Sequence, residues 1–218
     1  MEKNWIRPHL NILDREFIER IIEEAYTLLH KVGVQVESAE ALELLGSHGA
    51  RVEHDKAYLP QELVEKCLAT VPRTISLYDR DGVLAGQLTG DNVHFDPGSA
   101  ALNILEADGK TVRKPVTEDL VKFARLVEGL DNFAFQSTAL ICSDVPTDIA
   151  DRYRLFLVLQ YCRKPVVTGT FHEDAFEVMH RMLALVRGGE QQLREKPLAI
   201  FDCCPSSPLK WSQLTVHD

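Results

Sequence analysis

The stretch Lys196–Trp211, KPLAIFDCCPSSPLKW, opens with a short apolar run, Leu198 to Phe201, and continues with small polar residues and prolines. An apolar run of this length between prolines predicts a buried β-strand. The residues that follow predict a loop at the C-terminal end of this strand, which is where parallel α/β proteins bind their ligands. The stretch therefore indicates both the fold class and the place where a binding site is expected.

Two similar units precede this stretch. Phe133–Ile141 and Lys164–Thr170 are strand-like, and a helical pattern follows each of them, beginning at Thr147 or Asp148 after the first and covering 174–187 after the second. The three strand-then-helix units recur at a spacing of roughly 30 residues, the usual size of a βα repeat. Such alternation predicts an α/β fold with a parallel sheet and right-handed crossovers.

The part before these units has a different pattern. Helices are expected from Asp14 to Gly33, from Ser38 to the glycines at 46–49, and over 60–71, and short strands are expected at 34–36, 74–78, 84–88, 93–96 and 101–106. Asp108-Gly109 is a strong hairpin signal. We therefore predict an N-terminal helical and antiparallel β extension over residues 1–115, followed by the first βα units over residues 116–218.

Three parallel strands do not close a barrel, and a parallel sheet needs cover on both of its faces. We therefore expect these 218 residues to be the N-terminal part of a longer protein, or to depend on association with another chain. A homo-oligomer is one form that such association could take.

The bulk composition excludes several classes of protein. A hydrophobic content of 45% with 26% charged residues is typical of a soluble globular protein. No apolar run approaches the roughly 18 residues that span a bilayer, and no secretory signal is evident, so we expect a cytoplasmic protein without membrane contact. A net charge of −9 argues against nucleic-acid binding. Five sparse cysteines do not suggest a disulfide framework.

Mostly small or polar residues, and one aromatic residue, gather at the predicted strand ends. These are Gln136, Ser137, Cys142, Ser143 and Asp144 after the first strand, Thr168, Gly169, Thr170, Phe171, His172 and Glu173 after the second, and Asp202, Cys203, Cys204, Ser206 and Ser207 after the third. Parallel strands place these ends on one face. We therefore expect the ligand site there.

The chemistry of that site is less defined than its location. Cys203 or Cys204 could be a nucleophile if His172 served as its base and the thiol pKa were lowered. The simpler interpretation, which we favour, is that these cysteines pack or line the site. No third ligand stands at a recognisable spacing from His172-Glu173 or from His94 and Asp96, so no metal site is predicted.

Rings near the strand ends offer a second possibility. An aromatic cage for a quaternary ammonium needs two or three rings, and Phe95, Phe171 and Phe201 are candidates by position. The acidic net charge is consistent with a cationic small substrate, although a plain acidic soluble protein would show the same charge.

Ten short motifs occur in an order that resembles a known family. They are Val32–Val36, Ala39–Leu45, Leu59–Val64, Val71–Arg73, Phe95–Gly98, Asp119–Leu126, Asp144–Pro146, Lys164–Val167, Gly188–Glu190 and Pro205–Leu209. The ordered set resembles the trimethylamine methyltransferase family, the corrinoid-dependent methyltransferases and their non-pyrrolysine relatives that act on glycine betaine and similar compounds. Family members have about twice this length, and the pyrrolysine position that some carry would lie beyond Asp218.

The resemblance implies a fold and a reaction. The fold would be a (β/α)₈ TIM-type barrel, here incomplete, with an N-terminal helical and β-hairpin extension. The reaction would move a methyl group from a methylated amine, such as trimethylamine or glycine betaine, to the cobalt of a separate corrinoid protein, so that the chain itself would hold no tightly bound cofactor. The partners would be the corrinoid protein and the small amine.

Position at the strand ends predicts the residues that line the substrate. They are Gln136, Thr168, Gly169, Phe171, Cys203, Pro205 and Ser207. The implied chemistry requires no nucleophilic side chain, so no catalytic residue is assigned. Two alternatives remain open: a non-catalytic fragment or binding module with the same half-fold, and a cysteine-dependent hydrolase on a similar barrel.

Overall fold

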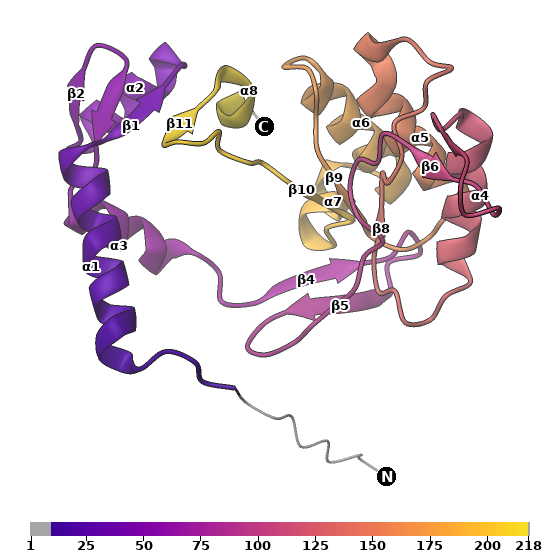
Figure 1. Ribbon diagram of the computed structural model, residues 1–218, viewed down its shortest axis with the longest axis horizontal. Helices are drawn as coiled ribbons and strands as arrows, with labels where there is room; N and C mark the ends of the chain where they lie inside the picture. The colour runs from indigo at the N-terminus through magenta and orange to yellow at the C-terminus, as the bar shows by residue number, and fades with distance from the viewer. Residues whose placement is uncertain (1–9, 218) are drawn as a thin grey trace. The chain divides into compact units, whose positions relative to one another are not determined.

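The computed structural model describes residues 10–217, in two compact units (Figure 1). The N-terminal unit extends to Thr70 and also includes Ser206–Trp211. The main unit comprises Val71–Pro205 and the residues from Ser212 onward. The predicted domain division at residue 115 stays a prediction.

Three helices of the N-terminal unit begin where the sequence predicts. Helix α1 covers Arg15–Lys31, α2 covers Ala39–Ser47 and α3 covers Gln61–Thr70. The Asp14 carboxylate accepts a hydrogen bond from the Phe17 amide at 2.7 Å, and the Ser38 hydroxyl accepts one from the Ala41 amide at 3.2 Å. These side chains satisfy amides that have no partner inside a first helical turn.

A four-stranded sheet completes the N-terminal unit. Its order is β11-β1-β3-β2, with β1 at Val34–Val36, β2 at Arg51–Glu53, β3 at Lys56–Tyr58 and β11 at Lys210–Trp211. Strand β11 runs parallel to β1, and the other pairs are antiparallel. The sequence predicts only a loop after the strand at Leu198–Phe201, and the pairing of Lys210–Trp211 with β1 was not predicted.

Gly33 is required at the junction of α1 and β1. Its φ is +73°, and a Cβ added there would lie 2.8 Å from the carbonyl oxygen of Ala57. A side chain would therefore meet both backbone strain and a clash with β3. This glycine lets the chain turn directly from the helix into the sheet.

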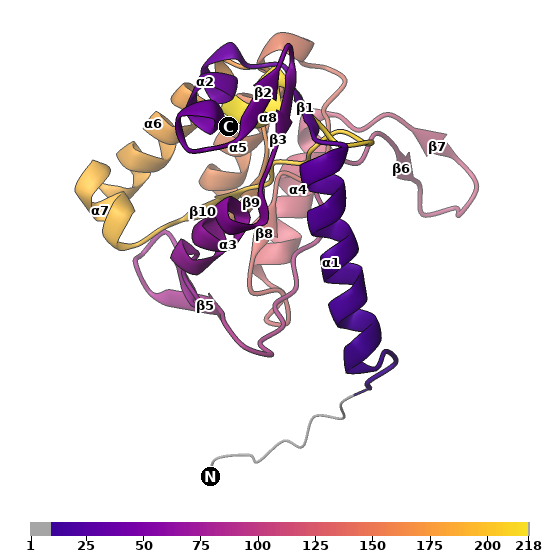
Figure 2. The same ribbon diagram turned by 90° about the vertical axis from the view of Figure 1, so that its left-hand side faces the viewer.

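The main unit contains the predicted parallel sheet. Strands β8 (Gln136–Ser137), β9 (Val166–Thr168) and β10 (Ala199–Phe201) are neighbours in the order β10-β9-β8. Both pairings are parallel, with Val166 opposite Gln136 on one side and Ala199 on the other. The three strands lie side by side in Figure 2. The α/β class is therefore confirmed, whereas a partial barrel remains an expectation, because the described residues contain an open sheet and no closed barrel.

Helices precede, connect and follow these strands. They are α4 (Thr117–Glu128), α5 (Ala150–Tyr161) after a 3₁₀ turn at Thr147–Ile149, α6 (Ala175–Arg187), α7 (Glu190–Glu195) and α8 (Gln213–His217). The core between sheet and helices includes Leu120, Leu155, Val158, Val166, Met179 and Leu198. All of these are almost fully buried, so apolar burial holds the strand ends in place.

Two antiparallel hairpins precede the parallel sheet. The first joins β4 (Ile75–Tyr78) to β5 (Leu84–Leu88), and the second joins β6 (Ile104–Leu105) to β7 (Val112–Arg113). The second hairpin projects beside α4 in Figure 2. It is tied to that helix because Arg113 donates two hydrogen bonds, of 2.7 and 2.8 Å, to the carboxylate of Asp119.

Three predicted strands differ from the structure. The strand predicted at 93–96 is wrong: these residues belong to no ladder, and Phe95 only accepts a hydrogen bond from the Phe135 amide at 3.3 Å. The strand predicted at 101–106 reduces to β6 and a single bridge between Ala101 and Leu140. The strand predicted over 133–141 reduces to β8. Isolated tertiary contacts replace regular pairing in these segments.

Candidate functional site

Side chains at the end of β8 point into the protein. Gln136 is fully buried, its amide donates to the carbonyl of Ala124 in α4 at 3.3 Å, and its oxygen accepts from the Ser137 amide at 2.9 Å. The hydrogen bond from Gln136 to Ala124 joins β8 to α4. The predicted substrate-binding role of Gln136 stays a prediction, and the structure gives this side chain a packing role.

A buried polar cluster lies where β8 and β9 end. The hydroxyl oxygens of Thr138 and Thr168 are 3.0 Å apart, and Arg154 of α5 donates from Nη2 to the Thr138 hydroxyl at 2.6 Å. Arg154 is only 2% exposed, and its Nε and Nη1 have no hydrogen-bond partner among the described residues. Burial lowers the pKa of Arg154 to about 10, against the raising effect of the Asp151 charge. The guanidinium therefore stays protonated at neutral pH.

Phe171 covers this arginine. The Cζ atom of Arg154 lies 4.6 Å from the centroid of the Phe171 ring, a cation–π contact. The backbone of Phe171 is held in place, because its amide donates a hydrogen bond to the Asp151 carboxylate at 2.9 Å. Phe171 is 38% exposed, so its outer side faces solvent.

Asp151, one turn before Arg154, organises the loop after β9. Its carboxylate is completely buried and also accepts from the Arg152 amide at 2.7 Å. The Nδ1 atom of His172 lies 3.5 Å from Asp151 Oδ2. Arg152 in turn pairs with Asp174 at 2.9 Å and holds the pKa of Asp174 below its ordinary value. The start of α5 therefore fixes the position of residues 171–174.

A hollow of about 420 Å³ opens beside this loop. It is lined by Phe171, His172, Glu173, Asp174 and Leu214. The Phe171 ring, the His172 imidazole and two carboxylates line this hollow, and one of the carboxylates, that of Asp174, is already paired with Arg152. The aromatic ring and the Glu173 carboxylate are groups that can attract a small cation. Of the three rings proposed for an aromatic cage, only Phe171 lines this hollow. Phe201 instead packs edge-on against Phe176 with ring centroids 4.9 Å apart.

The remaining predicted residues are less closely grouped. A Cβ at Gly169 would lie 3.1 Å from the Asp202 carbonyl, so this glycine allows β9 and β10 to end close together. Cys203 and Pro205 are exposed residues in the segment after β10. Ser207 belongs to the 206–211 segment of the N-terminal unit, whereas the other six predicted residues belong to the main unit.

The environment of Cys204 does not activate its thiol. The Cys204 thiol donates to Asp202 at 3.5 Å, and this carboxylate raises the pKa of Cys204 above its ordinary value. A nucleophilic thiol needs a lowered pKa. Within residues 10–217, no group of three His, Cys, Asp or Glu side chains is arranged to hold a metal ion, and no helix is long and apolar enough to cross a membrane.

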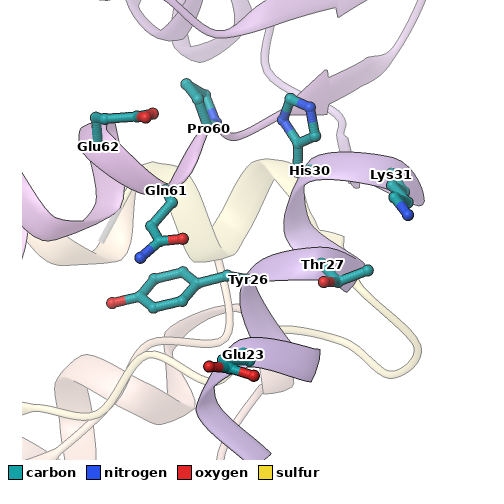
Figure 3. A pocket seen from close by; sticks show the side chains of 8 residues that line it. All are labelled: Glu23, Tyr26, Thr27, His30, Lys31, Pro60, Gln61 and Glu62. Atoms are coloured by element: carbon teal, nitrogen blue, oxygen red, sulfur yellow. The ribbon is translucent and has the colours of Figure 1, made fainter. Parts of the chain in front are cut away.

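A second hollow, of about 490 Å³, lies in the N-terminal unit between α1 and α3 (Figure 3). Its lining residues are Glu23, Tyr26, Thr27, His30, Lys31, Pro60, Gln61 and Glu62. Figure 3 shows the Tyr26 side chain pointing toward Gln61. None of the lining side chains is buried. The hollow therefore lacks the desolvated polar groups that the strand ends of the main unit have.

Arg154, Thr138 and Asp151 were not among the residues that we predicted for the site. A signal was present in the sequence. Asp151 and Arg154 stand three residues apart and share one helical face with the buried Leu155 and Val158. Charged residues on an otherwise apolar face are rarely buried without a role.

A family model described as "Trimethylamine methyltransferase (MTTB)" matches residues 3–217. A glycine betaine methyltransferase of Desulfitobacterium hafniense strain Y51 is 28% identical over 207 residues, covering 94% of this chain and 43% of the relative. A trimethylamine methyltransferase of D. hafniense strain DSM 10664 / DCB-2 is 29% identical over 185 residues, covering 84% of this chain and 37% of the relative.

An L-carnitine:corrinoid methyltransferase of Eubacterium limosum is 33% identical over 156 residues, covering 70% of this chain and 31% of the relative. The chain thus spans less than half the length of these curated relatives. All three relatives are named as methyltransferases, of glycine betaine, trimethylamine and L-carnitine.

Proposed function

Because the chain belongs to the trimethylamine methyltransferase family, we propose that it forms part of an enzyme that removes a methyl group from a small methylated amine. The observation that carries this proposal is the match over residues 3–217 to a family whose similar members are named as methyltransferases of trimethylamine, glycine betaine and carnitine. The resemblance expected from the ten sequence motifs is thereby confirmed.

The hollow beside the β9 end supports the same proposal. A quaternary or protonated amine is a compact cation, and the hollow offers it the Phe171 ring together with the carboxylates of Glu173 and Asp174. An aromatic face attracts such a cation even at an exposed site, by about 0.5–1 kcal/mol, and the outer side of Phe171 is open to it. The substrate side chains that we propose are therefore centred on Phe171, with Thr168, Gly169, Cys203 and Pro205 at the adjoining strand ends.

We further propose a corrinoid protein as the methyl acceptor. The name of the carnitine relative includes a corrinoid, whereas the names of the glycine betaine and trimethylamine relatives reported above state no acceptor. In this reaction the methyl group leaves a nitrogen that keeps the electrons of the C–N bond, and it becomes bonded to the reduced cobalt of the partner. The corrinoid is then a co-substrate carried by another protein.

This chemistry assigns three tasks to the protein. It binds the cationic amine, it orients one N–CH₃ bond toward the acceptor, and it excludes water from the reacting atoms. None of these tasks needs a nucleophilic side chain, which agrees with the raised pKa of the Cys204 thiol. The described strand ends would supply one part of the wall around the amine.

A methyl-transfer assay tests the proposal. The full-length protein is mixed with a reduced corrinoid protein and with trimethylamine, glycine betaine or L-carnitine, and the cobalt absorbance is followed. Methylation of cobalt with at least one amine is expected, and glycine serves as the unmethylated control. If none of the methylated amines changes the absorbance, the proposed function is wrong.

A further inference from the structure

We propose that the main unit has a second binding site, which takes a phosphate group where hairpin β4–β5 meets the ends of α6 and α7. The site is a hollow of about 280 Å³. Three cationic side chains line it, those of Arg80, Arg187 and Lys196, together with the carboxylates of Asp81 and Glu195. This ligand and this site play no part in the proposed methyl transfer.

The hollow lies where the parallel strands begin. The Tyr78 amide donates to the carbonyl of Pro197, just before β10, and the Arg80 amide donates to the carbonyl of Arg163, just before β9. The amine hollow lies after β9, because Phe171 lines it. The two hollows therefore belong to opposite ends of the strands.

The turn of the β4–β5 hairpin gathers two of the cations. Arg187, the last residue of α6, donates to the carbonyl oxygens of Asp79 at 2.8 Å and Tyr78 at 3.1 Å. Lys196, directly after α7, donates to the carbonyl oxygen of Gly82 at 2.9 Å. A Cβ added at Gly82 would lie 3.3 Å from Lys196 Nζ and 3.6 Å from Arg187 Nη1. Both charged groups therefore adjoin the same point of the turn.

These cations have no charged partner of their own. Among residues 10–217, no carboxylate forms an ion pair within 4.0 Å of Arg80, Arg187 or Lys196. Their side chains donate to backbone carbonyls instead, and the acceptor for Arg80 is the carbonyl of Leu159 at 2.8 Å. A carbonyl satisfies an N–H group without neutralising its charge. Three positive charges thus gather in one hollow of a chain whose net charge is −9.

The nearby carboxylates are engaged in other contacts. Burial lowers the pKa of Arg187 against the raising effect of the Asp79 charge, but Asp79 accepts from two amides of its own turn, at 3.0 and 2.8 Å. Asp81 pairs with Arg163 at 3.4 Å, and Glu195 accepts from the side-chain amide one turn earlier in α7 at 2.9 Å. Because Arg163 offsets Asp81, the three cations of the hollow exceed its remaining carboxylate by two charges.

Unused donors accompany this excess of charge. The Lys196 ammonium has three N–H donors and the Arg80 guanidinium has five, and each uses one of them on a described residue. The Nε atom of Arg187 is buried without a hydrogen-bond partner among the described residues, and an ion or a water commonly explains such an atom. A phosphate group supplies several acceptor oxygens and a charge of about −1.5 to −2, so it both satisfies donors and balances the charge.

Calorimetric titration of the full-length protein tests the site, with inorganic phosphate and glycerol 3-phosphate as the two ligands in a sodium chloride buffer of constant ionic strength. Saturable binding of one ion per chain is expected for at least one of them. Lys196→Gln and Arg80→Gln should each weaken this binding at least about tenfold, because hydrogen bonds to a charged group are lost. Lys122→Gln and Arg181→Gln are the matched controls, because they remove the same charges from exposed ion pairs on α4 and α6, and both should bind as the wild type does.

Each outcome supports or overturns the inference. Binding of glycerol 3-phosphate at least as tight as that of the free ion identifies a small phosphorylated molecule as the ligand, and weaker binding identifies phosphate itself. If neither ligand binds saturably to the wild type, the site is refuted, and this measurement needs no variant. An unchanged affinity in either Lys196→Gln or Arg80→Gln, when folded, shows an adventitious ion only and also refutes the site. Neither readout involves methyl transfer, so the proposed function stands or falls separately.

Discussion

Replacing Asp151 by Asn should destabilise the main unit far more than its position at a helix start suggests. The carboxylate is fully buried and accepts on both oxygens, from the Arg152 amide at 2.7 Å and the Phe171 amide at 2.9 Å. An Asn side chain offers one acceptor oxygen, so its NH₂ group must face one of these two donors. The substitution also removes the negative charge that raises the pKa of Arg154.

The expected magnitude follows from burial. Removing one partner of a buried charge pair costs about 3–5 kcal/mol, and we expect the lower end, about 3 kcal/mol, because Arg152 is partly exposed. With a urea m-value of roughly 1–3 kcal/mol/M, the unfolding midpoint should fall by about 1 M or more. Far-UV circular dichroism follows the global transition, and hydrogen exchange in peptides covering 147–175 reports on the Phe171 amide.

Asp174→Asn is the matched control for this substitution. Asp174 also pairs with Arg152, but its side chain is 76% exposed, and exposed ion pairs contribute about 0–1 kcal/mol. The control should therefore lower the midpoint only slightly and leave exchange at Phe171 unchanged. If Asp151→Asn and Asp174→Asn behave alike, the argument that Asp151 organises the strand-end loop is refuted.

Three further predictions concern other parts of the chain. Arg113 donates hydrogen bonds to Asp119 and lowers the pKa of this carboxyl group to about 2, below its unfolded value near 4. Asp119 should therefore stabilise the protein above pH 4, and this contribution should be lost as the pH falls toward 2. In an acid titration, the free energy of unfolding should depend less on pH in Asp119→Asn than in the wild type. Gly33→Ala should lower the free energy of unfolding by more than the roughly 1 kcal/mol expected for Gly49→Ala, because position 49 has a positive φ but open space around it. Trp211 fluorescence during urea unfolding measures this difference. Cys204→Ser should leave the methyl-transfer rate unchanged, because a thiol with a raised pKa is a poor nucleophile; a large loss would restore the cysteine hypothesis.

Local pattern was sufficient to predict much of the main unit. Leu198–Phe201 and Lys164–Thr170 contain strands at 199–201 and 166–168, and the helix expected at 174–187 covers 175–187. In these segments, apolar runs bounded by proline and glycine indicate both the element and its ends. The parallel order of the strands followed from the alternation of strand and helix.

Pairing over long distances in the sequence was not predictable. Strand β11 consists of two residues, Lys210 and Trp211, and forms because β1 presents a free edge about 175 residues earlier in the chain. Two residues carry no periodicity of their own. Arg154 escaped prediction for a different reason: its place on the apolar face of α5 was a signal, but its hydrogen-bond partner, Thr138, lies 16 residues earlier in the chain, after β8.

The return of residues 206–211 to the N-terminal sheet sets an order for folding during synthesis. Strand β1 accepts β11 through bonds such as Gln35 N to Leu209 O and Glu37 N to Trp211 O, both 2.9 Å. A ribosome adds about 5–20 residues per second, so roughly 7–30 s separate the appearance of Thr70 from that of Trp211. During this interval the edge of β1 is open to wrong partners. Ribosome-bound chains shorter than 211 residues should therefore be the ones that a chaperone protects.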